Sequence, residues 1–214
     1  VSLSSDGSTV AIGAPLNDGN GYNSGHVRVY NFDSGSSSWV QLGSDIDGEF
    51  SGGNSGSSVS LSSDGSTVAI GAIYNSGNGF ISGHVRVYNF DSESSSWVQL
   101  GSDIDGESMD DQSGYSVSLS SDGSTVAIGA RLNDGNGNDS GHVRTYSLEV
   151  DTDGDGVLDT ADAFPLDSSE SVDTDGDGTG NNADTDDDGD GVLDTDDAFP
   201  LDSTRSQSRG SIVN

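Results

Sequence analysis

VSLSSDGSTVAIGA, at residues 1–14, returns unchanged at residues 59–72 and 117–130, which gives the chain a strict period of 58 residues. Apolar residues alternate with small residues on both sides of a central Asp-Gly, the strongest short signal for a tight β-hairpin. A period a little above 50 residues, built from short β-segments, predicts a β-propeller or a related repeat array. Each unit of such an array buries its faces only against its neighbours.

The other residues of one repeat complete a blade of four short antiparallel strands. The middle unit of the pattern places these strands, in chain order, at residues 96–100, 115–119, 125–130 and 141–146. The predicted fold class is therefore all-β, a partial β-propeller of about three four-stranded blades. The predicted blades occupy residues 1–34, where the first strand is missing, 35–92 and 93–150.

Three segments of the repeat carry a family resemblance. They are GYSVSL at residues 114–119, VAIGA at residues 126–130 and GHVR at residues 141–144. Together they resemble the FG-GAP repeat of integrin-α-type β-propellers, with Tyr115 in the phenylalanine place and a complete Gly-Ala-Pro at residues 13–15. The resemblance covers about 150 residues and implies a propeller of about seven blades in an extracellular adhesion or surface protein.

Two features depart from that family. Integrin-type blades often hold calcium between two hairpin strands, but here that connection is only Ser-Asp-Gly-Ser, which leaves no room for a cation cage. The loop at residues 17–21 and its third copy at Asn133-Asp134 offer suitable oxygens, but the middle copy carries Ser76. We therefore expect a plain glycine-rich turn there rather than a blade-loop calcium site.

The number of blades is the second departure. Three blades cannot close a ring, because propellers have at least four blades, and residue 1 falls inside a repeat. We expect a fragment of a longer protein, so that a signal peptide would lie outside it. A short open stack, or a ring completed by a second chain, are the alternatives.

Several side chains recur once per repeat. The histidines are His26, His84 and His142. We expect them to face solvent on separate blades, too far apart to share a metal. The arginines two residues later are Arg28, Arg86 and Arg144. We expect these to pair with acidic residues of neighbouring strands, and Trp39 and Trp97 to pack between blades.

The charge balance is strongly acidic, with 37 aspartates and glutamates against six arginines and no lysine. This excludes an ordinary nucleic-acid binder, which needs a basic face. Residues 151–214 hold 19 of the acids and two arginines, a net charge of −17. Such a segment should be extended by its own repulsion unless cations neutralise it. Residues 203–214 are predicted to be a disordered tail, and the sequence contains no membrane-spanning segment.

One twelve-residue loop motif occurs three times in the acidic segment: DTDGDGVLDTAD from Asp151, DTDGDGTGNNAD from Asp173 and DDDGDGVLDTDD from Asp186. Oxygen side chains at positions 1, 3, 5, 9 and 12, a backbone carbonyl at 7 and glycine at 6 form the ligand order of a calcium loop. The predicted metal ligands are Asp151, Asp153, Asp155, Val157, Asp159, Asp162, Asp173, Asp175, Asp177, Thr179, Asn181, Asp184, Asp186, Asp188, Asp190, Val192, Asp194 and Asp197.

The loops are not flanked by the helices of an EF-hand. Only one residue separates Asp184 from Asp186, and Pro165 and Pro200 resist helix continuation after the other loops. Residues 151–202, with their twin Asp-Ala-Phe-Pro-Leu-Asp motifs, instead resemble thrombospondin type 3 repeats without cysteines. That resemblance implies an irregular acidic chain wound around calcium ions.

No catalytic constellation accompanies these motifs. The sequence has no cysteine, no Gly-x-Ser-x-Gly and no phosphate loop. Repeats also give equivalent blades rather than the unique pocket that paired catalytic carboxylates need. We therefore predict a non-enzymatic, calcium-binding extracellular or cell-surface protein, whose propeller contacts a protein or glycan partner. The alternative is a non-catalytic appendage of a larger secreted hydrolase.

Overall fold

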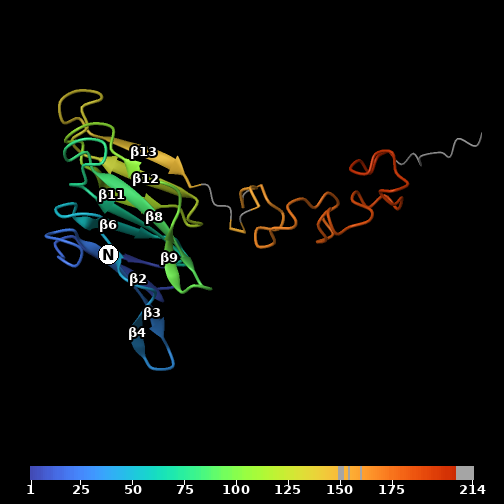
Figure 1. Ribbon diagram of the computed structural model, residues 1–214, viewed down its shortest axis with the longest axis horizontal. Coiled ribbons are helices and arrows are strands. Elements are labelled where there is room, and N and C mark those ends of the chain that lie inside the picture. The colour runs from blue at the N-terminus through green and yellow to red at the C-terminus, as the bar shows by residue number, and fades with distance from the viewer. Residues whose placement is uncertain (149–151, 154, 160, 206–214) are drawn as a thin grey trace, which may run out of the picture. The chain divides into compact units, whose positions relative to one another are not determined.

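A computed structural model describes residues 1–148, 152, 153, 155–159 and 161–205. The chain forms two compact units, Val1–Leu148 and Glu149–Asn214 (Figure 1). The described residues contain no helix that is long and apolar enough to cross a membrane.

The first unit consists of three antiparallel sheets that repeat one strand arrangement. The first contains β1 (Ser2–Leu3), β2 (Thr9–Ala14), β3 (His26–Asp33), β4 (Ser38–Gln41) and β5 (Ile46–Asp47). The second contains β6 (Ser55–Leu61), β7 (Thr67–Ala72), β8 (His84–Asp91), β9 (Ser96–Gln99) and β10 (Ile104–Asp105). The third contains β11 (Ser113–Leu119), β12 (Thr125–Ala130) and β13 (His142–Ser147). The prediction of an all-β fold with the blades of a partial propeller is confirmed.

The Asp-Gly turns join the first two strands of each sheet, as the sequence predicts. The glycines Gly7, Gly65 and Gly123 have φ of +72°, +78° and +76°. At the first turn the N–H of Ser8 and the hydroxyls of Ser4 and Ser8 donate to the Asp6 carboxylate. These hydrogen bonds, led by the Ser8 N–H, lower the pKa of Asp6 to about 2. The aspartate therefore serves the turn as a charged acceptor.

One strand assignment is corrected by the structure. The sequence pattern predicts residues 96–100 as the first strand of the blade that contains Tyr115. In the structure β9 pairs with β8, from Tyr88 opposite Gln99 to Asp91 opposite Ser96, so it is an outer strand of the preceding sheet. The four residues between β8 and β9 form a short hairpin connection, and strands joined this closely pair with each other.

Successive sheets pack face to face through apolar side chains, and Figure 1 shows β2, β6 and β11 side by side. The first interface joins Ala11, Val27, Val29 and Ile46 of the first sheet to Leu61, Val68, Ile70 and Tyr88 of the second. The second interface joins Ala69, Val85 and Val87 of the second sheet to Val126 and Ile128 of the third. These residues lie at equivalent repeat positions, so one interface is built twice.

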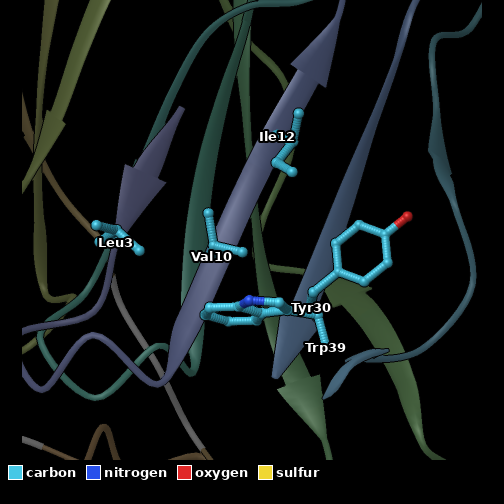
Figure 2. Close-up of a pocket in the computed structure, with 5 residues that line it drawn as sticks. All are labelled: Leu3, Val10, Ile12, Tyr30 and Trp39. Atoms are coloured by element: carbon cyan, nitrogen blue, oxygen red, sulfur yellow. The ribbon is translucent and has the colours of Figure 1, made fainter. Parts of the chain in front are cut away.

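The expected packing of a tryptophan between blades is confirmed for Trp97. Its side chain packs against the first interface, and its Nε1–H donates to Leu42 O at 2.9 Å. Trp39, at the same repeat position, is 47% exposed. It lines an apolar groove along β1 to β4 together with Leu3, Val10, Ile12 and Tyr30 (Figure 2).

Backbone contacts lock the same interfaces. Ser55 N–H donates to Ser24 O and Ser113 N–H donates to Ser82 O, each at 2.9 Å. A Cβ atom added to Gly13 would collide with the carbonyl oxygen of Gly56. The sheets therefore approach closely enough that only glycine fits there.

Candidate metal centres

Each acidic loop of the second unit brings three carboxylates together. The groups are Asp153, Asp155 and Asp162 in the first loop, Asp173, Asp175 and Asp177 in the second, and Asp186, Asp188 and Asp190 in the third. Within a group, one oxygen of each residue lies within 4.8 Å of the others. Such groups could hold a metal ion. Asp151, also a predicted ligand, lies outside the described residues.

The third loop has the most complete arrangement. Gly191 N–H donates to Asp186 Oδ2 at 3.0 Å, Asp190 N–H to Asp188 Oδ1 at 3.1 Å, and Val192 N–H to Asp190 Oδ1 at 2.8 Å. The other oxygen of each of these three carboxylates is buried and has no hydrogen-bond partner. One oxygen of each residue thus fixes its orientation, and the other is free to coordinate.

Asp197, at position 12 of the third loop, follows the same rule. It is fully buried, its Oδ1 accepts the N–H of Phe199 at 2.9 Å, and its Oδ2 is buried without a partner. Its charge contributes to raising the pKa of Asp188, after burial, which is the largest cause. A buried carboxylate oxygen without a donor is costly. A cation among these residues would remove that cost.

The first loop repeats the position-12 arrangement. Asp162 Oδ1 accepts the N–H of Phe164 at 2.8 Å, and Asp162 Oδ2 is buried without a partner. The Asp-Ala-Phe motif therefore has a structural reason in both loops. The N–H two residues after the aspartate turns one carboxylate oxygen toward the chain and leaves the second for the site.

The second loop is arranged differently. Both oxygens of Asp173 accept backbone N–H groups, from Gly176 at 2.7 Å and from Gly178 at 3.0 Å. Asp175 and Asp177 are exposed, and Asp184 Oδ1 accepts the N–H groups of its two following residues. The carboxylates of the second loop are therefore more exposed to solvent than those of the third, and Asp173 has no oxygen that is left without a hydrogen bond.

The predicted ligands at positions 7 and 9 make contacts within the chain. Position 9 accepts the N–H of position 2 in each loop: Asp159 from Thr152, Asn181 from Thr174 and Asp194 from Asp187. At position 7, the N–H groups of Val157, Thr179 and Val192 donate to the position-5 carboxylates. These bonds hold each loop closed, and the ligand roles of both positions stay predictions.

Asp187 occupies position 2, which the sequence predicts not to bind metal. Burial, followed by the charges of Asp194 and Asp184, raises the pKa of Asp187. Its Oδ1 is also buried without a hydrogen-bond partner, but Asp187 is not among the three grouped carboxylates of its loop. Its neighbours are therefore other acids, and it adds repulsion to the loop.

The blade loops form hydrogen-bonded turns. Asp18 Oδ1 accepts the N–H of Asn23 at 2.7 Å, and Asp134 Oδ1 accepts that of Asp139 at 2.7 Å. In the middle copy Ser76 Oγ accepts the N–H of Ile81 at 3.1 Å. Serine thus replaces aspartate because the position needs only one acceptor to close the turn.

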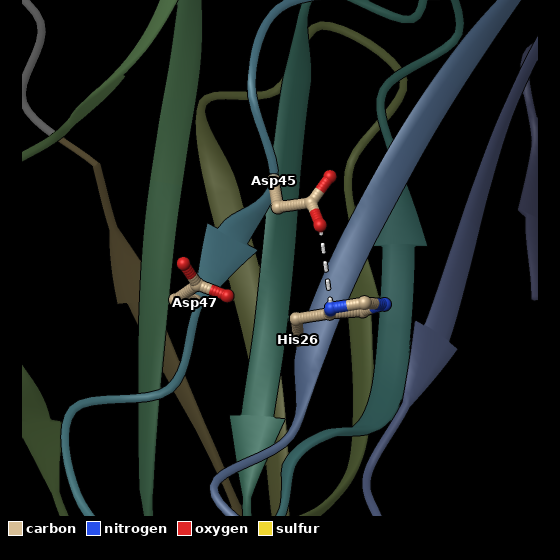
Figure 3. Close-up of side chains that lie close together, drawn as sticks. All are labelled: His26, Asp45 and Asp47. Atoms are coloured by element: carbon tan, nitrogen blue, oxygen red, sulfur yellow. Dashed lines mark ion pairs between the residues drawn. The ribbon is translucent and has the colours of Figure 1, made fainter. Parts of the chain in front are cut away.

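The prediction that the blade histidines face solvent is wrong for two of them. His26 is 6% exposed and His84 is 2% exposed. In the first sheet His26 Nδ1 lies 3.5 Å from Asp45 Oδ2, with Asp47 close by (Figure 3). Arg28 also donates to both oxygens of Asp45, at 2.9 and 2.8 Å. The positive charge of Arg28 on Asp45 would repel a metal cation at this site. We therefore regard His26, Arg28 and Asp45 as an ion-pair network.

In the second sheet, His84 lies between two acids. Its Nδ1 is 3.3 Å from Asp103 and 4.0 Å from Glu49, which lies in the loop between β5 and β6. Asn75 Oδ1 accepts the N–H of Gly77, so the Asn75 amide nitrogen, 3.4 Å from His84 Nε2, faces the ring as a donor. Nε2 therefore accepts and Nδ1 carries the proton. Nδ1 is buried and makes no hydrogen bond, although Asp103 lies 3.3 Å away.

The arginines pair with acids as expected, but the acids lie in loops and not on neighbouring strands. Arg28 pairs with Asp45 at 2.8 Å, Arg144 with Glu107 at 2.7 Å, and Arg86 with Glu49 at 3.7 Å. Arg86 and His84 of the second sheet both face Glu49, in the loop between β5 and β6. Sequence reasoning missed this contact because Glu49 lies in an irregular loop.

The buried His84 predicts a pH dependence of stability. Burial, its largest cause, lowers the pKa of His84 below the ordinary value of 6.5. The unfolded chain then takes up the proton first, so stability should fall as pH drops below about 6.5, by at most about 1.4 kcal/mol per pH unit. Thermal unfolding of the first unit between about pH 7 and 5 measures this. His84→Gln should flatten the slope, and His142→Gln, in a more exposed site, is the control. Equal slopes in wild type and His84→Gln would contradict the prediction.

Comparison with known proteins finds a family match that includes the third sheet. Residues 103–146, which run from β10 into β13, match the protein-family model of the FG-GAP repeat. The third sheet is similar to an FG-GAP repeat. Among solved structures, the chain is similar to the periplasmic gluconolactonase PpgL of Pseudomonas aeruginosa, with a TM-score of 0.43 and 19% sequence identity. The similarity covers 75% of this chain and 41% of the gluconolactonase. No curated protein matches the chain. The resemblance of residues 151–202 to thrombospondin type 3 repeats remains a prediction.

Proposed function

We propose that the protein binds calcium through the acidic loops of its second unit, and that the bound ions hold this unit folded. The third loop carries the proposal, because Asp186, Asp188, Asp190 and Asp197 each keep one buried oxygen that has no hydrogen-bond donor. Asp188, Asp190 and Asp197 each bind the chain through the other oxygen, as Asp186 does. The donors are therefore oriented before an ion arrives.

Calcium suits this donor set better than other common ions. Carboxylates and carbonyls in an irregular loop match the oxygen-rich, flexible coordination of Ca²⁺. Mg²⁺ requires a near-regular octahedron and keeps several of its waters. The absence of histidine and cysteine from the loops disfavours zinc and other softer ions.

The blades supply the second part of the proposed function. The FG-GAP match at residues 103–146 supports a propeller-type, adhesion-like module. We propose that its surface contacts a protein or glycan partner outside the cell or at the cell surface, with no catalytic step. The calcium-bound segment would serve as a stiff connection. The three sheets repeat one sequence unit, and repeated units suit repeated weak contacts better than one reaction.

Replacing one of the four aspartates named above for the third loop, here called the cage, tests the calcium proposal. Asp190→Asn removes one oriented carboxylate, and we expect the affinity of one site to fall at least about tenfold, because even residues behind direct ligands cost that much. Isothermal titration calorimetry of the 214-residue chain with Ca²⁺ measures it. Asp187→Asn is the matched control, since it removes the same charge three residues away and outside the cage. Equal losses in both variants would contradict the assignment of the cage.

A further inference from the structure

The second and third acidic loops are almost continuous along the chain, because Thr185 alone separates Asp184 from Asp186. Thr185 is hydrogen-bonded to both loops. Its N–H donates to Asp184 Oδ1 at 2.6 Å, and its carbonyl oxygen accepts the N–H of Asp194, in the third loop, at 3.0 Å. Thr185 thus ties a carboxylate of the second loop to the backbone of the third.

The position-12 aspartate of each loop accepts the N–H group two residues further on. In the first and third loops that residue is a phenylalanine outside the predicted ligand set, Phe164 for Asp162 and Phe199 for Asp197. In the second loop, Asp184 Oδ1 accepts the N–H of Asp186 at 3.0 Å. Asp186 is itself the first ligand of the third loop. The side chain at position 12 of the second loop is therefore oriented by the backbone of the third.

A second contact joins the two loops at Asp175, which occupies position 3 of the second loop. Its Oδ1 accepts the N–H of Asp177, in the same loop, at 3.0 Å. A Cβ atom added to Gly189, in the third loop, would lie 2.7 Å from Asp175 Oδ2. Asp175 therefore lies directly against the backbone of the third loop.

The two loops differ in the oxygens that they hold ready for an ion. Each of the four cage residues of the third loop keeps one buried oxygen without a hydrogen-bond partner. In the second loop both oxygens of Asp173 accept backbone N–H groups, and Asp175 and Asp177 are exposed. The second loop thus depends on the third for the placement of two predicted ligands, Asp175 and Asp184.

From these contacts we propose that the second and third loops bind calcium as a coupled pair, in which an ion in the third loop completes the site of the second. This coupling rests on the calcium function proposed above. An ion in the cage orders the backbone that holds Asp175 and Asp184, so less ordering remains to oppose the second ion. Linkage makes the effect reciprocal, so an ion in the second loop favours the third by the same factor.

The first loop stands outside this pair. Ten residues, 163–172, separate it from the second loop along the chain, and none of them is a predicted ligand. Its position-12 carboxylate is oriented by Phe164, which belongs to neither of the other loops. We therefore expect the first loop to fill without a comparable effect on the other two.

Titration of the full chain with Ca²⁺, followed by proton–nitrogen correlation NMR, resolves the loops through their position-6 glycines. The N–H of Gly178 donates to Asp173 Oδ2, and the N–H of Gly191 donates to Asp186 Oδ2, each at 3.0 Å. Each of these N–H groups is bonded to the first carboxylate of its own loop. The Gly178 signal therefore reports the second loop, and the Gly191 signal reports the third.

Asp190→Asn weakens the third site, and we expect it to raise the Ca²⁺ midpoint of the Gly178 signal at least about fivefold. Asp177→Asn should raise the midpoint of the Gly191 signal by a similar factor, because the coupling is reciprocal. Two controls remove the same charge, Asp187→Asn outside the cage and Asp155→Asn in the first loop. Both should move the Gly178 midpoint much less than Asp190→Asn does.

Two glycines inserted between Asp184 and Thr185 test the junction itself. The insertion keeps every predicted ligand and offers new N–H groups to Asp184, but it removes the link to the third loop. In that background Asp190→Asn should no longer shift the Gly178 midpoint.

A Gly178 midpoint that Asp190→Asn leaves unchanged in the chain without the insertion would overturn the coupling and leave the calcium proposal standing. A shift that survives the insertion would overturn the assignment of the coupling to this junction. Glycine signals that do not respond to Ca²⁺ would overturn the calcium proposal itself.

Discussion

Alanine in place of Gly71 is expected to separate the second sheet from the third. A Cβ at this position would collide with the carbonyl oxygen of Gly114, which belongs to the backbone of β11 and cannot rotate away. Overpacking of a rigid contact costs about 3 kcal/mol. For a unit of this size, we expect the melting temperature to fall by roughly 6 to 12 °C. Thermal unfolding followed by circular dichroism measures it.

The chain contains its own control for this substitution. Gly129 occupies the same repeat position in the third sheet, where a Cβ would lie 2.5 Å from Ser116 Oγ of its own sheet and meet no other sheet. A serine side chain can rotate, so Gly129→Ala should change the melting temperature by at most roughly 4 °C. Equal effects of the two substitutions would show that contact between sheets is not the reason for glycine at this position.

Removal of calcium is expected to unfold the second unit and leave the blades folded. Residues 151–202 carry 19 acids and no arginine, a charge of −19, and three calcium ions would reduce it to −13. Ordering costs roughly 1 to 2 kcal/mol per residue, and this segment has few apolar side chains to offset that cost. Ion binding is then its folding reaction.

Small-angle scattering and circular dichroism in excess chelator measure this expectation. The segment should expand toward the roughly 21 Å radius of gyration of an unfolded chain of its length. The β-sheet signal and the melting temperature of the first unit should stay unchanged. Added Ca²⁺ should restore the compact form, and Mg²⁺ at the same concentration should do so poorly. An unchanged radius in chelator would contradict the proposal that calcium folds this unit.

Much of the fold could be predicted from short-range signals. The Asp-Gly turns and the alternating residues of VSLSSDGSTVAIGA predict the β6–β7 hairpin, because these effects act between residues a few positions apart. The pairing of β9 was predicted wrongly, because the alternation of residues within a strand does not show whether the strand pairs with the preceding sheet or with the following one. The short connection after β8 was the available signal for the correct pairing.

The candidate metal ligands of the acidic loops could also be predicted from the sequence. Spacing predicted ligands at positions 1, 3, 5, 9 and 12 of each loop. The structure brings positions 3 and 5 together in every loop, with position 12 in the first loop and position 1 in the other two, and places no position-9 side chain in these groups. Spacing did not predict that Asp159 would accept the N–H of Thr152, or that the oxygens of Asp162 and Asp197 would divide between chain and site. Those features depend on how each loop folds back on the chain.

The sequence by itself determined the repeat, the strands, their turns and the acidic groups, because each of these depends on neighbours along the chain. Only the tertiary structure decided which copy of a residue is buried. Ile70 is 2% exposed but Ile12 is 40%, and Val27 is 0% exposed but Val143 is 70%, although each pair occupies one repeat position. The second sheet is covered on both faces. The outer sheets each keep one face open, because burial there requires a neighbouring sheet.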